Sequence, residues 1–72
     1  MKGFEIIIAS LPDREKVVAE IYYNNVQWLE ISQETDKLLI QFYPHPRQEY
    51  WEFQFDEAMA TLQEAKKNLL EE

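Results

Sequence analysis

The stretch that most constrains the fold is residues 17–32, VVAEIYYNNVQWLEIS, where two runs of β-branched and aromatic residues flank an Asn pair. Such runs favour strands, and Asn tolerates positive φ, so Asn24 and Asn25 predict a two-residue type I′ turn. That turn pairs Tyr23 with Val26 and sets the register of the whole hairpin. The other predicted pairs are Tyr22 with Gln27, Ile21 with Trp28, Glu20 with Leu29, Ala19 with Glu30 and Val18 with Ile31.

Further strands and one helix are predicted around this hairpin. Residues 4–10 form an almost continuous apolar run, and residues 38–43 and 50–54 also read as strands. With hairpin strands at 17–23 and 26–33, the chain predicts an antiparallel meander of four to five strands. Apolar residues then recur at helical spacing, which predicts a helix over 56–70 with Asp56 as its N-cap. The prediction is a single α+β domain, residues 1–72, with the helix packed on one sheet face.

The pairing pattern also predicts which residues face the helix. A second turn near Thr35 and Asp36 would pair Ile31 with Ile40 and Leu29 with Phe42. The predicted core face is Val18, Leu29, Ile31, Leu38, Ile40 and Phe42, covered by Met59, Leu62 and Leu69 of the helix. Core positions are also predicted for Trp51, Phe53 and Phe55, because they align with the apolar stripe of the predicted helix that follows. The opposite face would carry Tyr23, Trp28, Glu30, Gln41 and Tyr43, and would stay partly exposed because one helix covers one face.

The length limits the chain to one small domain, and the lack of cysteine is compatible with a reducing compartment. A chain of 72 residues buries a modest share of its surface, and with no cysteine it has no disulfide to stabilise it. We do not expect the start, MKGFEIIIAS, to act as a signal peptide, since its apolar run is only four residues long. No stretch approaches the roughly 20 apolar residues of a membrane span. We therefore expect a soluble cytoplasmic protein without membrane contact.

The net charge of −7 is concentrated in the predicted sheet. Residues 17–57 carry eight acidic and two basic residues, a net charge of −6. Such a surface repels nucleic acid and anionic lipid, whereas it attracts a basic protein. The alternative is that the acidic surface only keeps the protein in solution.

The chain offers no recognisable catalytic or metal-binding pattern. His45 is the only histidine, lies between two prolines, and is expected to be an exposed loop residue rather than a ligand. Glycine-rich phosphate loops and nucleophile motifs are absent from the sequence. Glu20 and Glu30 could act as an acid–base pair, but the predicted register places them on opposite faces. We therefore expect no enzyme activity, no metal and no cofactor.

Aromatic and acidic side chains are the candidates for binding a partner. Tyr and Trp are common binding anchors, but a small core needs them too, and for Trp28 and Tyr43 both interpretations stay open. The predicted anchors are Tyr23, Trp28 and Tyr43. The acidic residues predicted to attract a basic partner during the encounter, which we call steering acids, are Glu20, Glu30, Glu34, Asp36, Glu49 and Glu52.

The chain resembles the small immunity proteins of bacterial contact-dependent growth inhibition systems. The resemblance covers about residues 17–70 and rests on VVAEIYYNNVQWLEISQE, YPHP, W-x-F-x-F-D-E-A and a helix of the form L-x-x-A-x-x-x-L. It implies a strand meander with a C-terminal helix, a cytoplasmic location, no catalysis, and neutralisation of a cognate toxin domain. The alternative is a small structural or regulatory protein that self-associates through its sheet, without a toxin partner. A stable homodimer at low concentration, in the absence of a neighbouring toxin gene, would favour this alternative.

Overall fold

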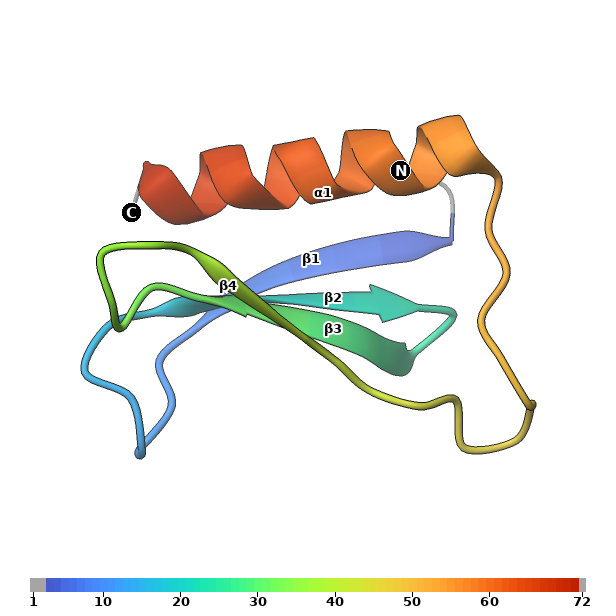
Figure 1. Cartoon of the computed structure of the whole chain (residues 1–72), viewed down its shortest axis with the longest axis horizontal. Helices are drawn as coiled ribbons and strands as arrows, with labels where there is room; N and C mark the ends of the chain where they lie inside the picture. The colour runs from blue at the N-terminus through green and yellow to red at the C-terminus, as the bar shows by residue number, and fades with distance from the viewer. Residues whose placement is uncertain (1–2, 72) are drawn as a thin grey trace.

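The computed structural model describes residues 3–71, which form a four-stranded antiparallel sheet with one helix on one face (Figure 1). The elements are β1 (Phe4–Ala9), β2 (Val18–Tyr23), β3 (Val26–Ser32), β4 (Leu39–Phe42) and α1 (Phe55–Leu70). The strand order β1-β2-β3-β4 is a meander, so the predicted α+β class is confirmed. Residues 1, 2 and 72 of the predicted domain lie outside the described part.

The turn between β2 and β3 has the predicted geometry. Asn24 and Asn25 have φ angles of 49° and 69°, as a type I′ turn requires of both central residues. The pairs Tyr23–Val26 and Tyr22–Gln27 follow directly. The backbone N–H of Asn24 also donates to the carbonyl of Gly3 over 2.9 Å, which attaches the turn to the start of β1.

A β-bulge at Trp28 changes the register beyond this turn. Tyr22 pairs with Gln27 but Ile21 pairs with Leu29, so Trp28 is an extra residue on β3. The predicted pairs of Ile21 with Trp28, Glu20 with Leu29, Ala19 with Glu30 and Val18 with Ile31 are therefore wrong. The extra residue moves every later residue of β3 by one position against β2. Because side chains alternate between faces, this shift also exchanges the predicted faces of these residues relative to β2. The predicted pairing of β3 with β4, by contrast, is confirmed for Leu29–Phe42 and Ile31–Ile40.

The bulge decides which aromatic residues enter the core. Trp28 is only 8% exposed and its ring lies 4.6 Å from that of Phe53 and 5.8 Å from that of Phe4. Tyr23 also packs on the helix side, 4.8 Å from Phe4 and 5.0 Å from Phe53 between ring centroids. The prediction that Trp28 and Tyr23 lie on the outer face is wrong. Val18 shows the converse error, since it alternates with Ala19 and lies on the outer face, fully buried.

Residues 50–54 do not form the predicted fifth strand. They run as an extended segment from β4 to the helix, and the strand pairing of the described residues stops at β4. Trp51 and Phe53 still pack against the core, as predicted. The indole N–H of Trp51 donates to the carbonyl of Tyr43 over 2.8 Å, which ties this segment to the end of β4. The alternating aromatic residues of this segment therefore pack at the end of the sheet and do not form a hydrogen-bonded strand pair.

The helix begins one residue earlier than predicted and has a different cap. Gln54 is the N-cap, and its side-chain oxygen accepts the N–H of Glu57 over 2.9 Å. Asp56, the predicted cap, lies in the first turn, where its charge suits the positive helix end. The inward stripe centres on Thr61, Ala65 and Leu69, which are fully or nearly fully buried.

The helix covers β1 and β2 more than the other two strands. Phe55, predicted in the core, is 73% exposed, and Ile40, Phe42 and Met59 are exposed as well. The prediction that the helix covers the whole Leu29, Ile31, Ile40 and Phe42 face is thus correct only for Leu29 and Ile31. β4 remains an open apolar edge.

Two adjacent leucines near the end of α1 provide a matched test of the helix orientation. Leu69 is 1% exposed and Leu70 is 57% exposed. We expect Leu69→Ala to lower the free energy of unfolding by about 2–5 kcal/mol, the cost of truncating a buried leucine. Leu70→Ala should change it by less than about 0.5 kcal/mol. Chemical denaturation of both variants measures the difference, and equal effects would contradict this orientation of the helix.

Candidate protein-binding site

The sheet face opposite the helix is the candidate binding surface. Its outward-facing polar residues include Glu5, Glu20, Tyr22, Gln27, Glu30, Gln41 and Tyr43, and we call these seven residues the acidic face. The exposed apolar side chains of Ile7 and Leu39 lie on the same side of the sheet. Two connections, residues 10–17 and residues 44–50, project on this same side of the sheet and border the face at its two ends (Figure 1). The face therefore combines carboxylates, phenols and amides without a covering helix.

The acidic face contains two carboxylates placed directly opposite each other. Glu20 of β2 pairs with Glu30 of β3 because of the bulge at Trp28. Opposed like charges on neighbouring strands destabilise a sheet. The sequence-based placement of these two residues on opposite faces is therefore wrong, and the arrangement requires compensation from elsewhere.

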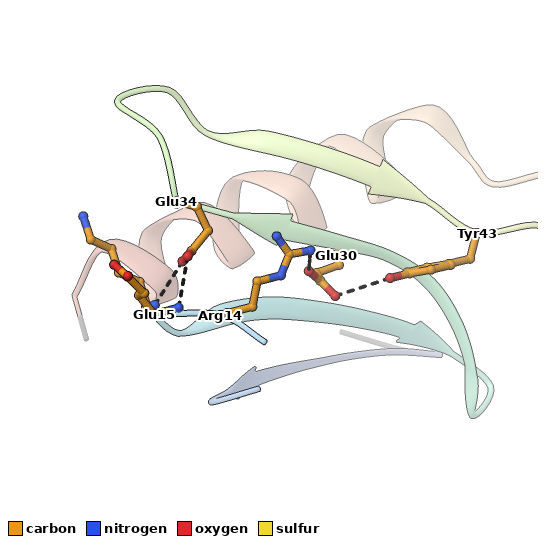
Figure 2. Close-up of polar contacts among 6 residues, drawn as sticks. Arg14, Glu15, Glu30, Glu34 and Tyr43 are labelled. Atoms are coloured by element: carbon orange, nitrogen blue, oxygen red, sulfur yellow. Dashed lines mark hydrogen bonds and ion pairs between the residues drawn. The ribbon is translucent and has the colours of Figure 1, made fainter. Parts of the chain in front are cut away.

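Arg14 compensates the charge of Glu30. Figure 2 shows its guanidinium reaching from the β1–β2 connection to Glu30, with 2.8 Å between Nη2 and Oε2. Glu30 is only 4% exposed, and the side chain of Arg14 is 24% exposed. A carboxylate so buried needs a partner, because removing a charge from water costs several kcal/mol. Arg14 is thus a structural part of the acidic face.

Tyrosines complete the hydrogen bonding of both carboxylates. The Tyr43 hydroxyl donates to Oε1 of Glu30 and the Tyr22 hydroxyl donates to Oε1 of Glu20, each over 3.3 Å. Burial raises the pKa of both phenols above the usual value, and the neighbouring carboxylate charge raises it further. Both tyrosines therefore remain protonated donors at neutral pH.

Glu34 fastens the β1–β2 connection to the end of β3. Its two carboxylate oxygens accept the backbone N–H groups of Glu15 and Lys16, each over 3.0 Å (Figure 2). These two hydrogen bonds hold the pKa of Glu34 below its usual value. Glu34, predicted as a steering acid, has this additional structural role of holding the connection that carries Arg14.

The structure brings together only part of the predicted site. Glu30 and Tyr43 lie in contact on the acidic face, whereas Tyr23 and Trp28 are on the helix side. Asp36 is exposed between β3 and β4, and Glu49 and Glu52 are exposed in the segment before the helix. Arg14 is a further residue of this face that was not predicted, because it lies 16 residues from its partner Glu30 and has no local sequence signal.

His45 packs against the aromatic segment before the helix. Contrary to expectation its ring is half-buried, 4.6 Å from that of Trp51, and Nδ1 accepts the N–H of Arg47 over 3.0 Å. Within residues 3–71, no three His, Cys, Asp or Glu side chains are grouped to hold a metal ion. Over the same residues, no helix has the length and apolar character needed to cross a bilayer.

Comparison of the chain with models of protein families finds no match. Comparisons with curated proteins and with solved structures find none either.

The ion pair between Arg14 and Glu30 can be tested with a double-mutant cycle. Arg14→Met leaves a buried carboxylate unpaired, and we expect a loss of about 2 kcal/mol in the free energy of unfolding. This is below the roughly 3–5 kcal/mol of a fully buried pair, because Arg14 keeps 24% of its side chain exposed. In a Glu30→Gln background the same substitution should cost much less. Additive effects of the two substitutions would show that the pair is uncoupled.

The lowered pKa of Glu34 predicts a specific pH dependence of the free energy of unfolding. Because its pKa is lowered by folding, its contribution is complete above its unfolded pKa of about 4.3 and is lost as pH falls through the folded value. Glu34→Gln should therefore reduce stability at pH 7, and the difference from the unsubstituted protein should shrink below about pH 4. Unfolding curves between pH 3 and 7 measure this. Asp36→Asn removes one charge from the same connection and is the control for net charge.

Proposed function

We propose that this chain is a non-catalytic cytoplasmic inhibitor that binds a basic partner protein, as an immunity protein binds its toxin. The observation that carries the proposal is the opposition of Glu20 and Glu30 on the acidic face. Arg14 offsets the charge of Glu30 but not that of Glu20, and locally unfavourable arrangements in natural proteins concentrate at functional sites. A basic partner would neutralise the excess charge.

The carboxylates of the acidic face differ in whether an arginine neutralises them, and this difference supports the proposal. Arg14 neutralises Glu30, whereas Glu5 and Glu20 have no ion-pair partner among residues 3–71. Tyr22 lies between them, since it pairs with Glu5 and donates to Glu20. The carboxylates can attract a cationic partner surface, and the adjacent tyrosine then offers it both an apolar ring and a hydroxyl group.

The charge of the partner follows from the same surface. The net charge of −6 over residues 17–57 disfavours nucleic acid and anionic membranes as ligands. Toxins that act on nucleic acid need basic surfaces to hold it, so an acidic inhibitor can block such a surface by charge complementarity. The resemblance to immunity proteins agrees with this partner class.

The proposal can be tested on the product of the neighbouring open reading frame, as the candidate toxin. Coexpression should relieve growth inhibition, and association measured by surface plasmon resonance should slow as salt rises from 50 to 300 mM. Glu5→Gln with Glu20→Gln should lower the low-salt association rate at least about threefold, because it removes the unpaired charges.

The matched control is Glu64→Gln with Glu71→Gln, which makes the same change in net charge at exposed positions in α1 and at its C-cap. Those two substitutions should alter association much less than the pair on the acidic face. Equal effects of the two pairs would show that only total charge matters. An association rate unaffected by salt would leave the acidic surface as a solubility feature.

A further inference from the structure

The β4 edge of the sheet lacks the features that usually prevent edge pairing. All four residues of β4, Leu39–Phe42, are exposed, and residues 38–43 contain no charged side chain and no proline. The other edge, β1, carries the exposed Glu5 in its strand. Sheet edges in monomeric proteins are normally blocked by charges, prolines, bulges or covering segments. An uncharged apolar edge is therefore prepared for pairing with another strand.

The hydrogen-bonding pattern shows which groups of β4 remain available. The N–H of Tyr43 donates to the carbonyl of Trp28 over 2.9 Å, so Tyr43 directs its backbone groups toward β3. Backbone groups alternate in direction along an antiparallel strand. Phe42 and Ile40 therefore direct their N–H and C=O groups away from β3, to the open side.

We propose that a second copy of this chain pairs with β4 in antiparallel orientation, about a two-fold axis at Ile40. In this register Ile40 lies opposite Ile40 of the second copy, and Leu38 lies opposite its Phe42. Both pairs use the outward-directed backbone groups. A register centred on Gln41 would instead bring Leu38 opposite Pro44 of the second copy, and proline has no N–H to donate. The first register therefore makes more hydrogen bonds.

The apolar surface beside β4 is suited to contact with a second copy of the chain. An open cavity of about 320 Å³ lies between α1 and β4, with Ile31, Leu38, Ile40, Met59 and Leu62 as its apolar lining and Gln63 and Lys66 as its polar lining. The two-fold axis runs perpendicular to the sheet, so both helices lie on the same side. The exposed side chain of Ile40 then meets Ile40 of the second copy, and that of Phe42 meets its Leu38, which extends the apolar strip across the axis.

Charge favours a second copy at this edge over a basic partner. Two chains that each carry −7 repel, so self-association needs a surface where no acidic side chains approach each other. Residues 38–43 meet this need, and the first charge beyond them, Lys37, lies opposite Tyr43 of the second copy. A basic partner, by contrast, has no charge to bind along this strand. The acidic face remains free in the dimer.

Sedimentation equilibrium of the full chain from 10 µM to 1 mM tests the proposal. We expect a dimer with a dissociation constant on the order of micromolar, as for a small interface. The dimer should strengthen with added salt, because salt screens the repulsion between the two chains. This is opposite to the salt effect expected for a basic partner at the acidic face, so each proposal can fail alone.

Two pairs of variants locate the interface. Ile40→Lys should raise the dissociation constant about tenfold or more, whereas Leu70→Lys, the same change at another exposed site, should not. Since the chain contains no cysteine, Ile40→Cys should form covalent dimers with a short thiol cross-linker and Leu70→Cys should not. A monomer at 1 mM, a dimer weakened by salt, or equal cross-linking of both variants would overturn the proposal.

Discussion

The β-bulge at Trp28 is the interaction on which the rest of the structure depends. One extra residue in β3 turns the indole into the core and places Glu30 opposite Glu20 on the outer face. Without it, an alternating strand cannot present Trp28 and Leu29 to the same side. Core packing and the charge pattern of the acidic face therefore have a common local cause.

The bulge also explains how a small chain without disulfides obtains a core. Phe53 comes from the segment before the helix, and its ring packs against those of Phe4, Tyr23 and Trp28 at 4.6–5.0 Å between centroids. Aromatic pairs of this kind contribute about 0.5–1.5 kcal/mol each beyond their buried area. Ring packing and the hydrogen bond from Trp51 to the Tyr43 carbonyl hold the segment after β4 at this end of the sheet, where strand pairing is absent among the described residues.

The molecule separates its charged and apolar surfaces. The acidic face carries the opposed carboxylates, while the open edge of β4 is uncharged and borders an apolar cavity. Salt should weaken binding at the first surface and strengthen it at the second, because one depends on attraction and the other must overcome repulsion. The two proposed interactions therefore use separate surfaces of one small domain.

The sequence by itself determined the features that depend on neighbouring residues. The positive φ angles of Asn24 and Asn25, the meander, the β3–β4 register and the position of the helix all follow from turn chemistry and periodicity. Only the tertiary structure decided the bulge, because both registers of β2 on β3 offer apolar pairs and the choice depends on where Trp28 finds ring partners. The pair between Arg14 and Glu30 was likewise decided by folding, since a contact across 16 residues leaves no trace in local periodicity.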